Sequence, residues 1–165
     1  MKTFFFATMT VVFLLYLTNG IQAQTTQTKL DQVELMQAWV GTWQRVIGKD
    51  SILVLEFQQY GKGFIQDLSL ITNGNKSIQG KACYSFSAKE DKFKVFSLTA
   101  DGNYLTFIVY FTTEKKWDQF LVQDFNHEKI LLKGEGELVT PNIYTSTWFD
   151  SNGVKTAEGK WTKAK

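Results

Sequence analysis

Few residues in this sequence are able to carry out chemistry, and their spacing forms no known catalytic motif. The chain has one arginine, Arg45, one histidine, His127, and one cysteine, Cys83. A single histidine excludes zinc sites built from several histidines. Cys83 has no second cysteine for an internal disulfide and no nearby histidine to activate it as a nucleophile. We therefore predict no metal site, no cofactor and no catalytic residue set.

Four charged or titratable groups still have alternative interpretations. His127 lies in a predicted turn, where a histidine is usually solvated, although it is also able to ligate haem iron or act as a general base. Arg45 follows Trp43 by two residues and so shares its strand face. If that face is inward, Arg45 needs an anion, either Glu158 of the last strand or a ligand carboxylate.

Glu56 and Asp67 are predicted to lie opposite each other across a hairpin. Inside a barrel such a carboxylate pair would share a proton and the pKa of one member would rise, as in a general acid. The hairpin register places both on the outer face, where a lysine and water screen them. Asn75-Lys76-Ser77 is a glycosylation sequon only if the chain enters a eukaryotic secretory pathway.

The start of the sequence is typical of a signal peptide. Lys2 precedes an apolar run, Phe4–Leu17, that is about 14 residues long and therefore short of the roughly 20 needed to span a membrane. We predict a signal peptide over 1–23, with cleavage after Gly20 as the alternative, a flexible tether over 24–29 and one domain over 30–165. The protein is then secreted or periplasmic.

The charge of the chain is nearly balanced, with 18 basic and 16 acidic residues. This balance argues against nucleic acid or an anionic membrane as the main partner. With no internal disulfide available, stability must come from the packing of a hydrophobic core.

A short helix and about ten strands are expected. Asp31 and Glu34 have the spacing of a capping box before a helix over Gln32–Val40, whose stripe of Val33, Met36 and Val40 should pack on the rest of the domain. The predicted strands are Thr42–Ile47, Ile52–Tyr60, Gly63–Thr72, Ser77–Ser87, Lys92–Thr99, Asn103–Thr113, Lys116–Phe125, Ile130–Val139, Asn142–Asp150 and Val154–Thr162. The fold class is all-β, an up-and-down antiparallel barrel of about 8–10 strands.

Hairpin loop lengths fix which side chains point inward. Two-residue loops at Asp101-Gly102 and Glu114-Lys115 carry one inner face through the meander. The predicted inner polar and aromatic residues, which are the candidate ligand-binding residues together with Arg45, are Gln66, Tyr84, Tyr104, Tyr110, Trp117, Gln119 and Gln123. The same register turns Thr106, Ile78 and Ile130 inward. It leaves an apolar outer stripe of Phe96, Leu98, Leu105, Phe107, Val109, Phe111, Phe120 and Val122.

Gly41-Thr42-Trp43, directly after the predicted helix, resembles the G-x-W signature of the lipocalins and the wider calycin superfamily. The resemblance implies a barrel with a central pocket, in which Trp43 plugs the closed end and Gly41 and Trp43 are structural. Ten strands exceed the eight of a standard lipocalin. Fatty-acid-binding proteins have ten strands but place a helical pair between the first two, where this chain has only 48–51.

Three functions are compatible with these features. The first is binding of a small apolar or amphipathic molecule inside the barrel. The second is an interaction protein that uses the outer apolar face of strands 92–125, for which we expect a homodimer or a partner protein. The third is an isomerase- or decarboxylase-type enzyme, which requires an inward Asp or Glu, and the predicted register supplies none outside the last strand, whose inner face is ambiguous. The sequence favours binding over catalysis.

Overall fold

The computed structural model describes residues 29–164. The predicted signal peptide and nearly all of the tether lie outside this range. The described elements are α2 (Gln32–Gln37), β1 (Gly41–Gly48), β2 (Ser51–Tyr60), β3 (Gly63–Thr72), β4 (Asn75–Ser87), β5 (Lys92–Thr99), β6 (Tyr104–Phe111), β7 (Lys116–Gln123), β8 (Asn126–Thr140), β9 (Ile143–Phe149) and β10 (Lys155–Lys163). No helix among these residues is long and apolar enough to cross a membrane.

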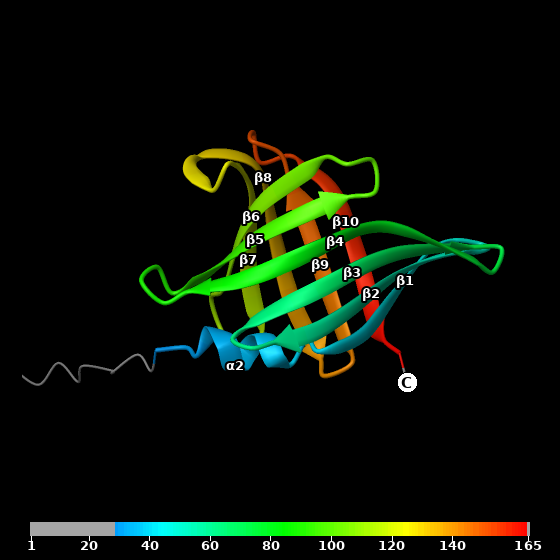
Figure 1. Cartoon of the computed structure of the whole chain (residues 1–165), viewed down its shortest axis with the longest axis horizontal. Coiled ribbons are helices and arrows are strands. Elements are labelled where there is room, and N and C mark those ends of the chain that lie inside the picture. The colour runs from blue at the N-terminus through cyan, green and yellow to red at the C-terminus, as the bar shows by residue number, and fades with distance from the viewer. Residues whose placement is uncertain (1–28, 165) are drawn as a thin grey trace, which may run out of the picture.

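The ten strands form a closed barrel in which each strand pairs antiparallel with its sequence neighbours and β10 pairs with β1 (Figure 1). The prediction of an all-β up-and-down barrel with a short N-terminal helix is therefore confirmed. All ten predicted strands are present, with ends that differ by a few residues at most. Closure leaves no long free sheet edge, which removes the usual route to strand-mediated aggregation.

Helix α2 lies across one end of the barrel (Figure 1). Asp31 caps it by accepting hydrogen bonds from the backbone N–H groups of Val33 and Glu34, at 3.0 and 2.9 Å. The helix ends at Gln37, so the predicted end at Val40 is wrong. Met36 is buried as expected, whereas Val40 is exposed because it lies beyond the helix, in the connection to β1.

Polar contacts fasten α2 to two distant strands. The side-chain amide of Gln32 donates to the carbonyl of Phe111 at 3.1 Å and accepts from its N–H at 2.6 Å. Gln32 is only 5 % exposed, and it completes the hydrogen bonding of the end of β6. From β10, the Lys163 ammonium donates to the Ala38 carbonyl at 3.3 Å. These bonds fix the helix as the floor of the barrel.

The inner face of β6 is the reverse of the prediction. The β5–β6 loop has three residues, Ala100–Gly102, because Thr99 N–H donates to Asn103 O at 2.8 Å and Gly102 has a φ of +86°. Such a loop, a type I turn followed by a left-handed glycine, shifts the register by one residue relative to a two-residue loop. Leu105, Phe107, Val109 and Phe111 consequently point inward, and Tyr104, Thr106, Ile108 and Tyr110 point outward.

The β6–β7 loop is also one residue longer than predicted. Thr112 N–H donates to Lys116 O at 2.9 Å, so the loop is 113–115 and not Glu114-Lys115 alone. The two differences cancel, and Trp117 and Gln119 on β7 point inward as predicted.

Bulges overturn three further inward predictions. A register shift between β3 and β4 places Ile78 opposite Ser69 and leaves it 69 % exposed. Shifts between β7 and β8 pair Val122 with Ile130 and leave Gln123 exposed beside the turn. Each bulge inserts an extra residue on one strand and so reverses the faces beyond it.

Candidate functional site

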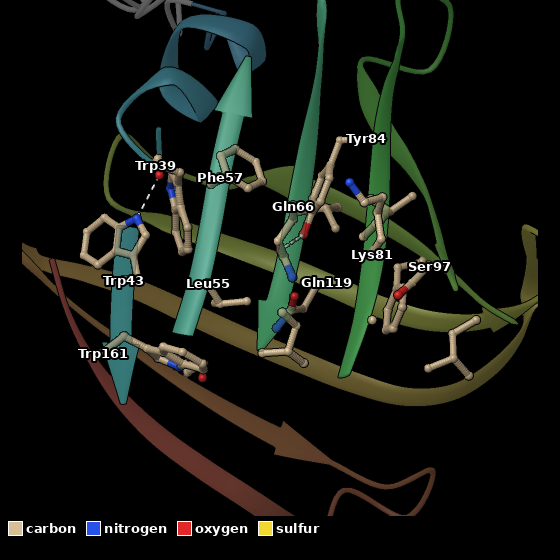
Figure 2. Close-up of a pocket in the computed structure, with 18 of the residues that line it drawn as sticks. Trp39, Trp43, Leu55, Phe57, Gln66, Lys81, Tyr84, Ser97, Gln119 and Trp161 are labelled. Carbon is tan, nitrogen blue, oxygen red and sulfur yellow. Dashed lines mark hydrogen bonds between the residues drawn. The ribbon is translucent and has the colours of Figure 1, made fainter. Parts of the chain in front are cut away.

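The barrel encloses a pocket of about 350 Å³ between the floor made by α2 and the opposite end (Figure 2). Its apolar and aromatic lining is Met36, Trp39, Trp43, Leu53, Leu55, Phe57, Leu68, Ala82, Val95, Leu105, Phe107, Val109, Phe111, Trp117, Trp148 and Trp161. Its polar lining is Gln66, Gln79, Tyr84, Ser97, Thr99, Gln119, Tyr144 and Ser146, together with Gly80 and Lys81. A concave, mostly apolar site with a few polar groups is the usual form of a small-molecule pocket.

Tryptophan and tyrosine rings form the floor of this pocket. Trp39 contacts Trp117 edge-on, with ring centroids 4.2 Å apart, and Tyr144 at 4.5 Å. Tyr144 in turn stacks on Trp161 at 5.7 Å. Trp43 is 1 % exposed, and its indole N–H donates to the carbonyl of Trp39 at 2.8 Å. Trp43 therefore plugs the helix end of the barrel, and Gly41, with a φ of +129°, allows the chain to turn from the floor into β1.

Two polar side chains on the wall of the pocket are hydrogen-bonded to each other. The Tyr84 hydroxyl donates to Gln66 Oε1 at 2.7 Å, and both side chains project into the interior from adjacent strands (Figure 2). Burial raises the pKa of Tyr84 far above its ordinary value, so the phenol stays protonated and remains a donor at neutral pH. Gln66 Nε2 is left free to donate to a bound molecule.

Four other polar side chains of the lining have no hydrogen-bond partner in the described part of the chain. They are the Ser97 hydroxyl, the Gln119 amide, the Tyr144 hydroxyl and the Ser146 hydroxyl. Tyr144 is 4 % exposed and Ser146 is 9 % exposed, and each touches open space inside the pocket. Among the described residues no buried side-chain nitrogen or oxygen atom lacks a partner, so the polar atoms of these residues reach the open space of the pocket and are not enclosed by protein. The pocket thus offers neutral donors and acceptors to a molecule placed within it.

Inward-facing glycines make room for large neighbours in this wall. A Cβ on Gly134 would lie 2.6 Å from Gln119 Cγ, and one on Gly159 would lie 2.6 Å from Arg45 Nη1. These side chains therefore lie flat over the glycines of the adjacent strand. Without the glycines the same residues would have to project further into the pocket.

Arg45 is half-buried on the inner face of β1, and the inward alternative for this residue is correct. Its Nη2 donates to the backbone carbonyl of Glu158 at 2.7 Å. The predicted partner, the Glu158 carboxylate, is turned outward and pairs with Lys155 instead. Arg45 lies toward the open end of the barrel, two residues beyond Trp43 on the same face.

Four of the eight candidate ligand-binding residues do not line the pocket, namely Arg45, Tyr104, Tyr110 and Gln123. Tyr104 points outward and donates to Asp124 Oδ1 at 3.0 Å. Tyr110 also points outward, stacks on Phe120 with centroids 6.0 Å apart and lies under the Lys92 ammonium. Gln123 is exposed at the end of β7. Gln66, Tyr84, Trp117 and Gln119 line the pocket as predicted.

The outer apolar stripe is smaller than predicted, because Leu105, Phe107, Val109 and Phe111 belong to the interior. Val122 is 2 % exposed. The Thr106 hydroxyl beside it donates to the Val122 carbonyl at 2.6 Å and accepts from Phe125 N–H, so the end of β7 folds over the outside of β6. Phe96 and Leu98 remain exposed, at 44 and 48 %. Five of the eight stripe residues are therefore not available for the contact predicted in a homodimer.

The remaining candidate groups lie on the outside. Glu56 faces Asp67 as predicted, and each carboxylate has its own ion pair at 2.9 Å, with Lys76 and Lys81 respectively. Cys83 is exposed. His127 is also exposed, 3.9 Å from Glu90. Among residues 29–164 no cluster of three or more metal-ligating side chains occurs.

Several pocket residues were not identified from the sequence, namely Trp39, Tyr144, Ser146, Trp148 and Trp161. The inner face of the last strand was ambiguous, and no inner face was predicted for the strand Asn142–Asp150. Tyr144, Ser146 and Trp148 nevertheless alternate on one side of β9, and this spacing was a usable signal. Trp39 follows the helix and had no predicted orientation.

No protein-family description matches this chain, and no curated protein is significantly similar to it. The ten-stranded closed barrel also differs from the eight strands of a standard lipocalin.

Proposed function

We propose that this protein binds a small apolar or amphipathic molecule inside the barrel, in the manner that its resemblance to lipocalins implies. The observation that carries this proposal is the pocket of about 350 Å³, whose wall is mostly aromatic and aliphatic. This volume lies within the range of about 300–1,000 Å³ that is usual for ligand sites. Small barrels commonly fill their interior with side chains, and this one retains open space.

The polar groups of the wall support a binding role over a catalytic one. Among the described lining residues there is no Asp, Glu or His, so no general acid or base of the ordinary type faces the pocket. The one lysine, Lys81, pairs with Asp67 at 2.9 Å. Neutral amide and hydroxyl groups orient a ligand without reacting with it.

The test is fluorescence titration with the methyl ester of cis-parinaric acid, an uncharged polyene that fluoresces more strongly in apolar surroundings. We expect saturable binding that Ser97→Trp abolishes, because Ser97 lines the pocket and an indole there fills it. Phe96→Trp is the matched control, since Phe96 is the next residue on the outer face of β5 and should leave binding unchanged. Equal binding by wild-type protein and Ser97→Trp would contradict a site inside the barrel.

A further inference from the structure

Two glutamine amides enter the pocket from strands that lie nearly across the barrel from each other. Gln66 projects from β3 and Gln119 from β7, which is four strands away around the ten-stranded barrel. Both side chains reach the interior (Figure 2). A molecule that fills the pocket therefore meets an amide group on each side.

The amide of Gln66 is held in one orientation by Tyr84. The Tyr84 hydroxyl donates to Gln66 Oε1 at 2.7 Å, and burial raises the pKa of this hydroxyl above its ordinary value, so it remains a donor at neutral pH. Gln66 Nε2 has no hydrogen-bond partner among the described residues. Gln66 therefore presents N–H donors to the pocket, because its oxygen is turned toward Tyr84.

The amide of Gln119 is positioned by a glycine on the next strand. A Cβ on Gly134 would lie 2.6 Å from Gln119 Cγ, 2.8 Å from Gln119 Nε2 and 3.0 Å from Trp148 Cε3. The Gln119 side chain thus lies over the bare backbone of Gly134, beside the Trp148 ring. Neither its oxygen nor its nitrogen has a partner in the described part of the chain, so Gln119 offers an acceptor and a donor side by side.

The pocket has no free charge to balance an ionised ligand. Lys81 is the one charged residue among the described residues that line it, and Lys81 pairs with Asp67 at 2.9 Å. A carboxylate would lose its water without gaining a counterion there, and it would face the oxygen of Gln119. An uncharged amide costs less to desolvate, and its own donor and acceptor match those of Gln119.

The spacing along β7 suits a ring with an amide attached. Trp117 is the next inward residue from Gln119 toward the floor, about 7 Å away along the strand. Its ring contacts Trp39 edge-on, with centroids 4.2 Å apart, and both rings line the pocket. Aromatic rings pack favourably in offset or edge-on contact with other rings. The floor therefore accepts an aromatic body whose polar group lies at the level of Gln119.

We infer that the barrel selects uncharged aromatic amides, with the ligand amide hydrogen-bonded to Gln119 and Gln66 and the ring packed on the tryptophans of the floor. The inference rests on the proposed function, because it names the ligand class of the same pocket. Tyr84 and Gly134 are positioning residues, since Tyr84 orients Gln66 and Gly134 leaves room for Gln119.

The experiment compares three probes with one ring system, 2-naphthamide, methyl 2-naphthoate and the 2-naphthoate anion, by isothermal titration calorimetry at pH 7 on the full chain. We expect wild-type protein to bind the amide at least about tenfold more tightly than the ester or the anion, because only the amide satisfies both the donor and the acceptor of Gln119. Gln119→Met keeps the length of the side chain without its polar atoms, and it should remove this preference while leaving ester affinity unchanged.

Three further variants test the positioning of the amides. Gly134→Ala keeps Gln119 but displaces it, and Tyr84→Phe keeps the ring but releases Gln66, so each should lower the ratio of amide to ester affinity. Circular dichroism confirms that each variant is folded. Gln123→Met is the matched control, since Gln123 is an exposed glutamine at the end of the same strand as Gln119 and should leave all three affinities unchanged.

The outcomes distinguish the two proposals. If the anion or the ester binds as tightly as the amide, or if Gln119→Met weakens amide and ester alike, the amide class is refuted while the pocket stands. If no naphthalene probe binds but the parinaric ester does, the ligand class is again refuted and the proposed function stands. If the parinaric ester also fails to bind, both proposals fail. Selective loss of amide binding in Gln119→Met and Gly134→Ala, with Gln123→Met unchanged, supports the inference.

Discussion

The indole of Trp117 on β7 lies directly on Gly136 of β8, so that a Cβ at position 136 would fall 1.8 Å from Trp117 Cζ2. The two residues are directly paired across the strands. The ring occupies the space that any other residue at 136 would need, and from there it reaches Trp39 and Tyr144 on the floor. The absence of a side chain at Gly136 therefore allows Trp117 to take its place in the pocket floor.

We expect Gly136→Ala to lower the free energy of unfolding by about 1–3 kcal/mol, because the buried ring of Trp117 has to move and overpack its neighbours. Urea unfolding followed by circular dichroism measures the change. Gly48→Ala is the control, since a Cβ there meets only Ser51 at an ordinary 3.7 Å and should alter stability by less than about 0.5 kcal/mol. Equal stability of the two variants would contradict the tight packing of Trp117.

Gln32→Ala should destabilise the protein by at least about 2 kcal/mol. The substitution removes both hydrogen bonds to the Phe111 backbone and leaves a buried N–H and C=O without partners. Thermal and urea unfolding report the loss. Gln37→Ala, on the exposed side of the same helix, should have little effect, and a comparable loss there would show that helix propensity and not the contact with β6 is responsible.

The double substitution Phe107→Lys with Val109→Lys should prevent folding, because two charged side chains would enter the interior without partners. The matched pair Phe96→Lys with Leu98→Lys lies on the outer face of the neighbouring strand and should remain folded. Circular dichroism and gel filtration of the two double variants show which of them folds. A soluble, folded Phe107/Val109 variant would show that these two side chains lie on the outer face of the barrel.

Stability should decrease at alkaline pH through the buried tyrosines. The pKa of Tyr84 is raised by burial above its ordinary value of 10.0, so the folded protein keeps a proton that the unfolded chain loses. The stabilisation is complete below about pH 10 and is lost as the pH rises toward the folded pKa, at up to about 1.4 kcal/mol per pH unit for each such group. Urea unfolding between about pH 9 and pH 11 should show this slope, and Tyr84→Phe should reduce it. An identical slope in the variant would argue against burial of the phenol.

Much of the fold followed from local patterns. We located α2 and the ten strands from signals between residues that are close in the sequence. These signals were the Asp31 cap, the alternation of side chains along each strand and the glycines of the turns. The inner face of β6 depended on the exact length of two loops, and Asp101-Gly102 is compatible with both a two- and a three-residue turn. A second signal was available, since Leu105, Phe107, Val109 and Phe111 form a wholly apolar face, whereas Tyr104, Thr106 and Tyr110 do not.

The candidate site was less predictable because its parts meet only through barrel closure. Gln66 of β3 and Tyr84 of β4 were assigned correctly to the wall from the hairpin register, whereas Trp117 and Gln119 of β7 were assigned correctly only because the two loop-length differences cancel. The direction of Arg45 depended on the pairing of the first strand with the last, which no turn encodes. The Glu158 carboxylate was the natural partner by charge, yet it turns outward, and the backbone carbonyl takes its place.

The first and last strands share only two paired positions, Trp43 with Lys163 and Gln44 with Thr162, although the other neighbouring strands pair along most of their length. Even the nearer of these two pairs, Gln44 with Thr162, is separated by 118 positions in the sequence, so the pairing of β1 with β10 carries the largest chain-entropy cost of any strand pairing in the barrel. Hairpins with local contacts form early, and a distant, short pairing forms late and opens first. The amide hydrogens of β1 and β10 should accordingly exchange with solvent before those of β3 and β4, and the barrel should open and reclose along this line without unfolding elsewhere.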